Sequence, residues 1–250
     1  GGLQKRSDSG YDKHIYSSDK LIGQVPLGNR KDIRDAVEYA SNESKWRSMS
    51  AHARAQVLYY AAENLDLRKD EFARTIQLMT GENGKDEVDQ ALENIFYFAS
   101  WADKFEGTIH NVPIRGVSLA MKEPLGVIAI VCPDNNPLLS FIHLVFSALC
   151  MGNTVVVVPS EKHPLCAIDM YQIFETSDFP PGAINIVTGN RDELSETLSK
   201  HMQVDGIWYF GSKEGSKKIE ENSNSNLKQT WVNNGLSYSW VDLPKEIKMK

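Results

Sequence analysis

The sequence predicts an α/β fold, in which a parallel sheet is flanked by helices. Continuous apolar runs at residues 126–131, 154–158, 184–187 and 206–210 have the length and composition of buried strands. Segments with helical spacing separate these runs. Strands that alternate with helices form a parallel sheet with right-handed crossovers.

The first part of the chain predicts two different regions. Residues 1–30 are expected to be an irregular or β-rich lead, since Gly23, Pro26 and Gly28 interrupt any longer pattern. Apolar residues then recur at helical spacing, which predicts an N-terminal helical layer over residues 31–110.

A short segment with a different period follows. Val117, Leu119 and Met121 alternate with small or polar residues, so residues 111–124 are expected to contain a half-exposed strand. Pro124 ends this alternation, which is typical of an edge strand.

Residues 125–250 are expected to form the domain with the parallel sheet. Its helices are predicted at 137–151, 164–176, 192–200 and 212–221, and a fifth strand at 227–232. Few composition changes divide the chain after residue 31, so we expect 31–250 to be one compact unit.

Composition excludes several classes of function. The net charge of -6 argues against a nucleic-acid partner, and no apolar run approaches the ~18 residues that span a membrane. Cys132, Cys150 and Cys166 all lie in apolar segments, which favours buried, reduced thiols in a cytoplasmic protein. The histidines show no metal-ligand spacing, so no metal site is expected.

Eight segments match one known family in order and spacing. They are Trp101–Lys104, Lys122–Val127, Pro133–Leu139, Gly152–Val157, Pro159–Glu161, Pro180–Asn185, Gly211–Ser212 and Asn226–Lys228. From about residue 20 to about 240, the chain resembles the aldehyde dehydrogenase superfamily. The resemblance implies a Rossmann-like NAD-binding domain with an N-terminal helical layer and a protruding strand used for oligomerisation.

The chain is most similar to one branch of that family. It covers only the first part of a full-length member and several motifs are altered, as in the truncated, degenerate C-terminal domain of a tandem family 16 aldehyde dehydrogenase. This resemblance implies a catalytic dehydrogenase module in the same polypeptide as one partner, and a homo-oligomer as another. Other protein partners remain open.

The resemblance also implies that the catalytic residues are lost. The family's general-base glutamate falls on Asn233, or on Val232 after a shift of one residue, and neither side chain accepts a proton near neutral pH. No cysteine follows Cys166 in the sequence, so the family's nucleophile is missing from it. Asn135 matches the family's oxyanion-binding asparagine. A polar loop at Asn135 and a polar turn at Asn233 are the structural alternatives.

The cofactor motifs are retained only in part. Glu161 matches the family's ribose-binding glutamate, and Gly211–Ser212 matches the start of the helix that faces the pyrophosphate. Val158 replaces a ribose-binding lysine, and Asp134 replaces a tryptophan beside the phosphates. A carboxylate there is expected to repel pyrophosphate. The resemblance therefore implies no bound cofactor, or weak NAD binding at most.

We therefore expect a non-catalytic, aldehyde dehydrogenase-like domain that acts in assembly or partner docking. The expected interface consists of two sets of exposed apolar residues: Val117, Leu119 and Met121, and Trp231, Tyr238 and Trp240. If the C-terminal aromatics instead fold back over their own face, the domain is a monomer. Two further alternatives are an NAD-binding or NAD-sensing module without turnover, and a fragment of an active NAD-dependent dehydrogenase.

Overall fold

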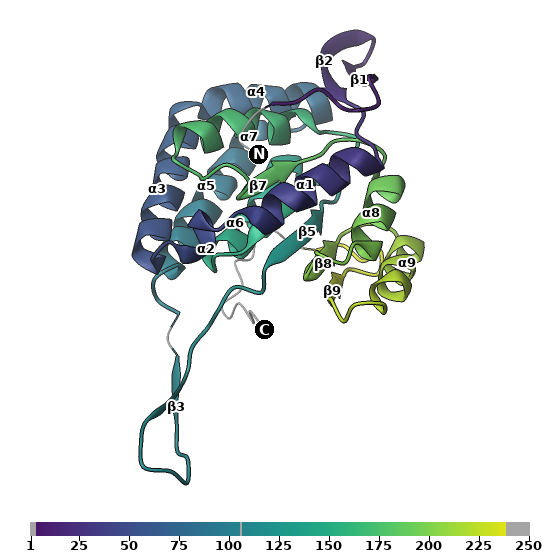
Figure 1. The fold of residues 1–250 in the computed structure, drawn as a ribbon. Helices are drawn as coiled ribbons and strands as arrows, with labels where there is room; N and C mark the ends of the chain where they lie inside the picture. Colours follow the sequence, from purple (N-terminus) through teal and green to yellow (C-terminus); the bar gives the residue numbers. More distant parts are fainter. Residues whose placement is uncertain (1–3, 106, 239–250) are drawn as a thin grey trace.

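A central parallel sheet organises the computed structural model, which describes residues 4–105 and 107–238 (Figure 1). The sheet order in these residues is β7-β6-β5-β8-β9. The strands are β5 (Val127–Val131), β6 (Thr154–Val158), β7 (Ile184–Ile186), β8 (Gly206–Tyr209) and β9 (Gln229–Val232). All residues of β5 and β6 are buried, as their continuous apolar runs predict. The predicted α/β class with a parallel sheet is confirmed.

Helices α6 and α7 cover one face of the sheet, and the helices α3, α4 and α5 pack outside them. Their bounds are α6 (Pro137–Cys150), α7 (Leu165–Thr176), α3 (Ala51–Leu67), α4 (Lys69–Thr80) and α5 (Gly84–Trp101); the short α2 (Lys45–Ser48) precedes α3. Every residue of α6 is buried, because the helix lies against β6 and is covered by α5 and α3. This explains why its sequence is apolar on all sides.

The opposite face of the sheet is covered by α1 (Arg30–Asn42), α8 (Arg191–Lys200) and α9 (Lys213–Ser223) (Figure 1). The expectation of a single helical layer over 31–110 was therefore incomplete. Ile33 and Val37 of α1 pack with Val156 of β6 and with α8, in a core separate from that of α3 to α5. Helical spacing shows which side of a helix is buried but not which face of a sheet it covers.

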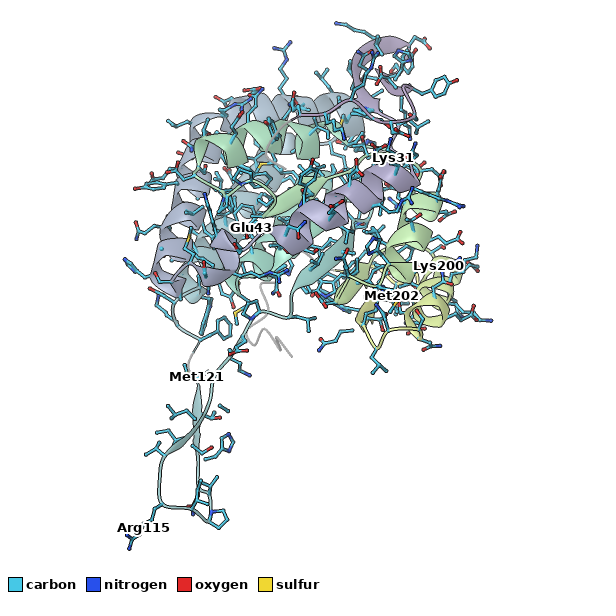
Figure 2. All side chains as sticks on the ribbon, in the orientation of Figure 1. Lys31, Glu43, Arg115, Met121, Lys200 and Met202 are labelled. Carbon is cyan, nitrogen blue, oxygen red and sulfur yellow. The ribbon has the colours of Figure 1, made fainter. Side chains whose placement is uncertain are left out.

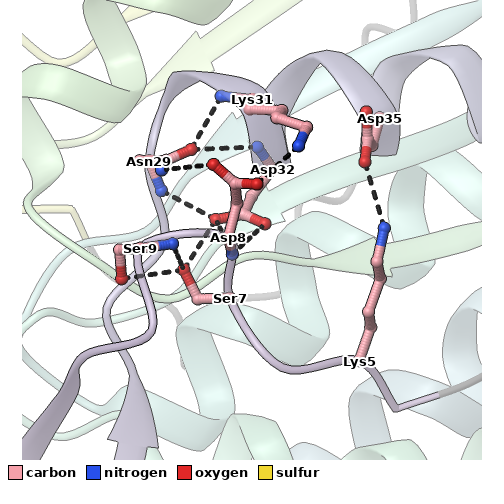
Figure 3. Close-up of polar contacts among 8 residues, drawn as sticks. All are labelled: Lys5, Ser7, Asp8, Ser9, Asn29, Lys31, Asp32 and Asp35. Carbon is pink, nitrogen blue, oxygen red and sulfur yellow. Dashed lines mark hydrogen bonds and ion pairs between the residues drawn. The ribbon is translucent and has the colours of Figure 1, made fainter.

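The N-terminal lead contains a hairpin of β1 (Asp12–Ser17) and β2 (Lys20–Pro26). The segment before the hairpin is fixed to the start of α1, as Figure 3 shows. Asp32 accepts hydrogen bonds from Ser7 Oγ at 2.7 Å and from the Asp8 backbone N–H at 3.1 Å. Asp32 and Asn29 also form a capping box. The lead is thus tied to the sheet domain by polar contacts.

A second hairpin projects from the body as a long arm (Figures 1 and 2). It consists of β3 (Thr108–His110) and β4 (Ser118–Ala120), which pair antiparallel. Arg115 lies at its tip, and Met121 lies where the arm returns to the body (Figure 2). The predicted single strand in 111–124 is therefore one half of a hairpin. Its partner strand lies in the segment expected to be helical, and three residues are too few to show an alternating period.

Two further structural features bear on function. No helix in the described part of the chain has both the length and the apolar composition needed to cross a membrane.

The side chain of Glu87 on α5 caps the start of α6, accepting from the backbone N–H groups of Leu138 at 2.8 Å and Leu139 at 3.0 Å. This contact replaces a side-chain cap, which the N-cap residue Asn136 does not provide.

Candidate functional site

A cleft lies at the carboxyl ends of the parallel strands. It has a volume of about 370 Å³ and is lined by Lys13, Asp134, Glu161, Lys162, Arg191, Asp192, Tyr209 and Ser212. These residues come from the loops after β5, β6 and β8, from the first turn of α8 and from β1. The chain order reverses between β5 and β8, and ligands of open α/β sheets bind at such a point.

Asp134 is enclosed by hydrogen-bond donors. Its Oδ1 accepts from Arg191 Nη2 at 2.6 Å and from Ser160 Oγ at 2.8 Å. The same oxygen accepts from the backbone N–H groups of Glu161 at 3.1 Å and Lys162 at 3.3 Å. Asp134 therefore links its own loop after β5 to the loop after β6 and to the start of α8.

The charge of Asp134 is compensated within the cleft. Burial acts to raise the pKa of Asp134, but Arg191 and the hydrogen bonds outweigh burial and hold the pKa below its usual value. An unpaired carboxylate was expected here from the sequence. In the structure Asp134 is paired with Arg191, which comes from a different loop.

Glu161 is also engaged by its own chain. Its Oε2 accepts from the backbone N–H of Arg191 at 3.0 Å, at the start of α8. Its Oε1 lies 3.7 Å from Lys13 Nζ, which donates to the Glu161 carbonyl at 2.9 Å. The carboxylate that matches a ribose-binding position is thus bonded to protein groups on both sides.

The other two cofactor positions differ in their surroundings. Val158 is 1% exposed and packs in the core with α1 and α8, so this position presents no cation to the cleft. Ser212 lines the cleft and caps α9, its Oγ accepting from the Gly215 N–H at 3.0 Å. The Tyr209 hydroxyl occupies the space beside Gly211 and Gly215 and leaves no room for a β-carbon at either.

The matched catalytic positions lie outside this network. Asn135 is exposed in the loop before α6. Asn233 follows β9 and makes contacts that close a turn: its Oδ1 accepts from the Gly211 N–H at 3.1 Å, and its Nδ2 donates to the Leu236 carbonyl at 2.8 Å. A glutamate in this place could not donate the second bond.

The predicted interface residues fall in two separate places. Val117, Leu119 and Met121 lie on the β3–β4 arm and are exposed. Trp231 is 37% exposed on β9, and Tyr238 folds back onto it with ring centroids 5.8 Å apart. Trp240 lies outside the described residues.

Sequence reasoning missed Arg191, Lys13 and Ser160. One signal could have led to Arg191: a carboxylate directly after a buried strand needs a cation nearby, and Arg191 is the first basic residue after β7. Lys13 and Ser160 gave no comparable signal. No group of three metal-ligating side chains is placed to hold an ion in residues 4–105 and 107–238.

Comparison with family models shows which protein family the chain belongs to. The model of the aldehyde dehydrogenase family matches residues 4–239. The chain belongs to the aldehyde dehydrogenase family. Aldehyde dehydrogenase, cytosolic 1 from Elephantulus edwardii is 31% identical over 230 residues, covering 88% of this chain and 46% of that relative. Retinaldehyde dehydrogenase 3 from Homo sapiens is 33% identical over 231 residues, covering 88% and 44%.

Solved structures of the family share the fold. A putative aldehyde dehydrogenase from Burkholderia cenocepacia superposes with a TM-score of 0.89 at 26% identity, covering 92% of this chain and 49% of that one. A betaine aldehyde dehydrogenase from Staphylococcus aureus, solved in complex with NAD+, gives a TM-score of 0.88 at 28% identity, covering 92% and 48%. The chain thus spans about half the length of the aldehyde dehydrogenases it matches.

Proposed function

We propose that this chain is a non-catalytic aldehyde dehydrogenase domain that acts in assembly or partner docking. The observation that carries the proposal is Asn233, which stands where the family resemblance places the general base. Its amide oxygen accepts from the Gly211 N–H after β8 and its amide nitrogen donates to the Leu236 carbonyl in the turn after β9, so both ends of the amide are engaged. An amide has no basic lone pair near neutral pH, so it cannot take the proton that aldehyde oxidation releases.

The loss of catalysis is tested by turnover. We expect the purified chain to form no NADH from aldehydes with NAD+ and to hydrolyse no activated esters, because it lacks a base at residue 233. Turnover that disappears when Cys132, Cys150 or Cys166 is replaced would contradict this proposal.

The β3–β4 arm supports a role in association. Its apolar side chains are far more exposed than usual: Ile109 78%, Leu119 60% and Met121 67%. Isolated two-stranded ribbons are marginally stable in water, and unpaired apolar edges pair with other chains. We propose that the arm binds a second copy of this chain or a dehydrogenase module of the same polypeptide, in a parent protein of the tandem type.

Sedimentation tests the association. We expect the chain to form a dimer or larger assembly, and Leu119→Asp to shift it to monomer, since a buried charge opposes pairing. Leu67→Asp is the matched control, because Leu67 is 83% exposed at the end of α3 and should leave the assembly unchanged. A clean monomer for the wild-type chain, together with an unchanged assembly of the parent protein when it carries Leu119→Asp, would refute the role of the arm.

The second candidate function is an NAD-binding module without turnover. The start of α9 at Ser212, which lines the cleft, favours it, because a helix N-terminus attracts anions. Because the cofactor positions Asp134 and Val158 are altered, we propose that any NAD binding is weak, with a dissociation constant no better than about 100 μM. Thermal unfolding with and without NAD+ distinguishes the two, since a bound ligand raises Tm by mass action.

A further inference from the structure

Arg191 reaches across the carboxyl edge of the sheet. It begins α8, directly after the loop that follows β7, while its partner Asp134 follows β5. In the sheet order, β6 lies between β7 and β5. The Arg191 side chain therefore passes over the end of β6 and over the Ser160–Glu161 loop to make its 2.6 Å contact.

This path runs along the part of the cleft where the family resemblance locates the adenosine ribose. One carboxylate oxygen of Glu161, the ribose-matching residue, accepts from the Arg191 backbone N–H. The Arg191 and Asp134 side chains are themselves only 15% and 25% exposed. Residues that would face a nucleotide are thus bonded to one another.

We infer that the Asp134–Arg191 ion pair is an internal occupant of the cleft, and that it closes the adenosine side of the ancestral cofactor site. The two charges act together: each charge alone would lack its ion-pair partner in the cleft, whereas the pair joins the loops after β5 and β6 to the start of α8 and stabilises the closed arrangement. A nucleotide has to displace the guanidinium before it reaches Glu161. This inference rests on the cleft and is independent of association through the arm.

Calorimetric titration with AMP tests the inference, because AMP fills only the adenosine side. The proteins compared are the wild-type chain, Arg191→Met, Asp134→Asn and the double variant. Methionine keeps the length and packing of the arginine stem without the charge. Asparagine keeps an oxygen that Arg191 can still bond, so Asp134→Asn alone should leave the cleft closed.

We expect the double variant to bind AMP at least tenfold more tightly than wild type, and Arg191→Met to gain less because Asp134 is then unpaired. The control is Arg30→Met, whose arginine lies outside the cleft with a side chain 72% exposed, and it should bind like wild type.

Two results would overturn the inference. If Asp134→Asn alone binds AMP as tightly as the double variant, simple repulsion by the carboxylate is the cause. If the double variant gains no affinity, the ion pair is not what closes the cleft. Should Arg191→Met fail to fold, Arg191→Gln takes its place, because glutamine is uncharged and shorter than arginine. The tenfold criterion then applies to Arg191→Gln combined with Asp134→Asn.

Discussion

Individual charged residues in the interior each have a specific set of partners. Asp134 is bonded to Arg191 and to two backbone N–H groups, and Glu87 to the start of α6. Lys228 donates to the carbonyls of Leu198 and His201 at the end of α8. Burial of a charge is costly unless such partners are present, so these contacts fix how loops and helix ends meet.

Glu87 offers a test of charge against hydrogen bonding. Burial raises the pKa of Glu87 above its usual value, although two N–H donors oppose the shift. Its contribution to stability is therefore present at acid pH and lost as pH rises through the folded pKa. At pH 7 we expect Glu87→Gln to be at least as stable as wild type, and Glu87→Ala to lose about 2 kcal/mol, because two buried N–H groups lose their acceptor.

Urea unfolding measures both variants. The control is Glu93→Gln on the exposed side of the same helix, which should be neutral. If Glu87→Gln is as unstable as Glu87→Ala, the negative charge itself is required at the start of α6.

Because Lys228 is buried, we expect the free energy of unfolding to depend on pH in the alkaline range. Burial lowers the pKa of Lys228 to about 8 from its ordinary value of 10.5. Between these values the unfolded chain binds more protons, so stability rises with pH across this window. The difference in unfolding free energy between wild type and Lys228→Met should therefore increase by roughly 2 kcal/mol from pH 7.5 to pH 10.

Lys217→Met supplies the matched control, since the Lys217 side chain is 78% exposed and should give a flat difference. A flat difference for Lys228→Met as well would mean that its two carbonyl partners compensate for burial.

Asp134 shows why the chemistry of single residues was only partly predictable. Its identity and place after a buried strand were readable, and the structure places it in the cleft with Glu161 and Ser212. Its partner Arg191 lies 57 positions away in sequence, and a side chain that reaches across the end of β6 leaves no local pattern. The predicted repulsion of pyrophosphate therefore took account of Asp134 but not of its partner Arg191.

Helix packing in this fold depends on close approach at one glycine. A β-carbon at Gly84 would overlap the Ala73 carbonyl, where α5 begins against α4. Alanine has a higher helix propensity than glycine by up to about 1 kcal/mol, but overpacking costs about 1–3 kcal/mol. We expect Gly84→Ala to lower stability by about 1–2 kcal/mol in chemical unfolding, with Lys85→Ala, at the exposed next position, unchanged. A stabilised Gly84→Ala would show that the two helices can separate without cost.

At the level of elements, prediction succeeded where composition alone decides. Strands β5 and β6 are runs of Val, Ile and Ala, and such runs fit only a sheet buried on both faces. The sequence did not allow us to predict which face of the sheet α1 covers, or that β3 exists. The first depends on the direction of the chain after residue 42, and the second on a pairing across the tip of the arm.

Across the whole molecule, the three thiols report on global unfolding. Cys132, Cys150 and Cys166 are all buried. Burial raises the pKa of Cys132 and of Cys150 to about 12, and that of Cys166 well above its usual value. We expect no reaction of the folded chain with Ellman's reagent at pH 8 beyond the rate of unfolding, and three reactive thiols in denaturant. Fast labelling of any cysteine in the native state would reveal a local opening.

The strand order has a consequence for synthesis on the ribosome. Strand β5 pairs with β6, which follows it directly, and on its other side with β8, which is made only after β7 and α8. While those segments emerge, a nascent chain carries one completed half of the sheet beside an open, wholly apolar strand edge. Such an edge attracts chaperones or other nascent chains. Force measurements on stalled ribosomes should therefore detect two separate folding steps, the later one when β8 leaves the exit tunnel.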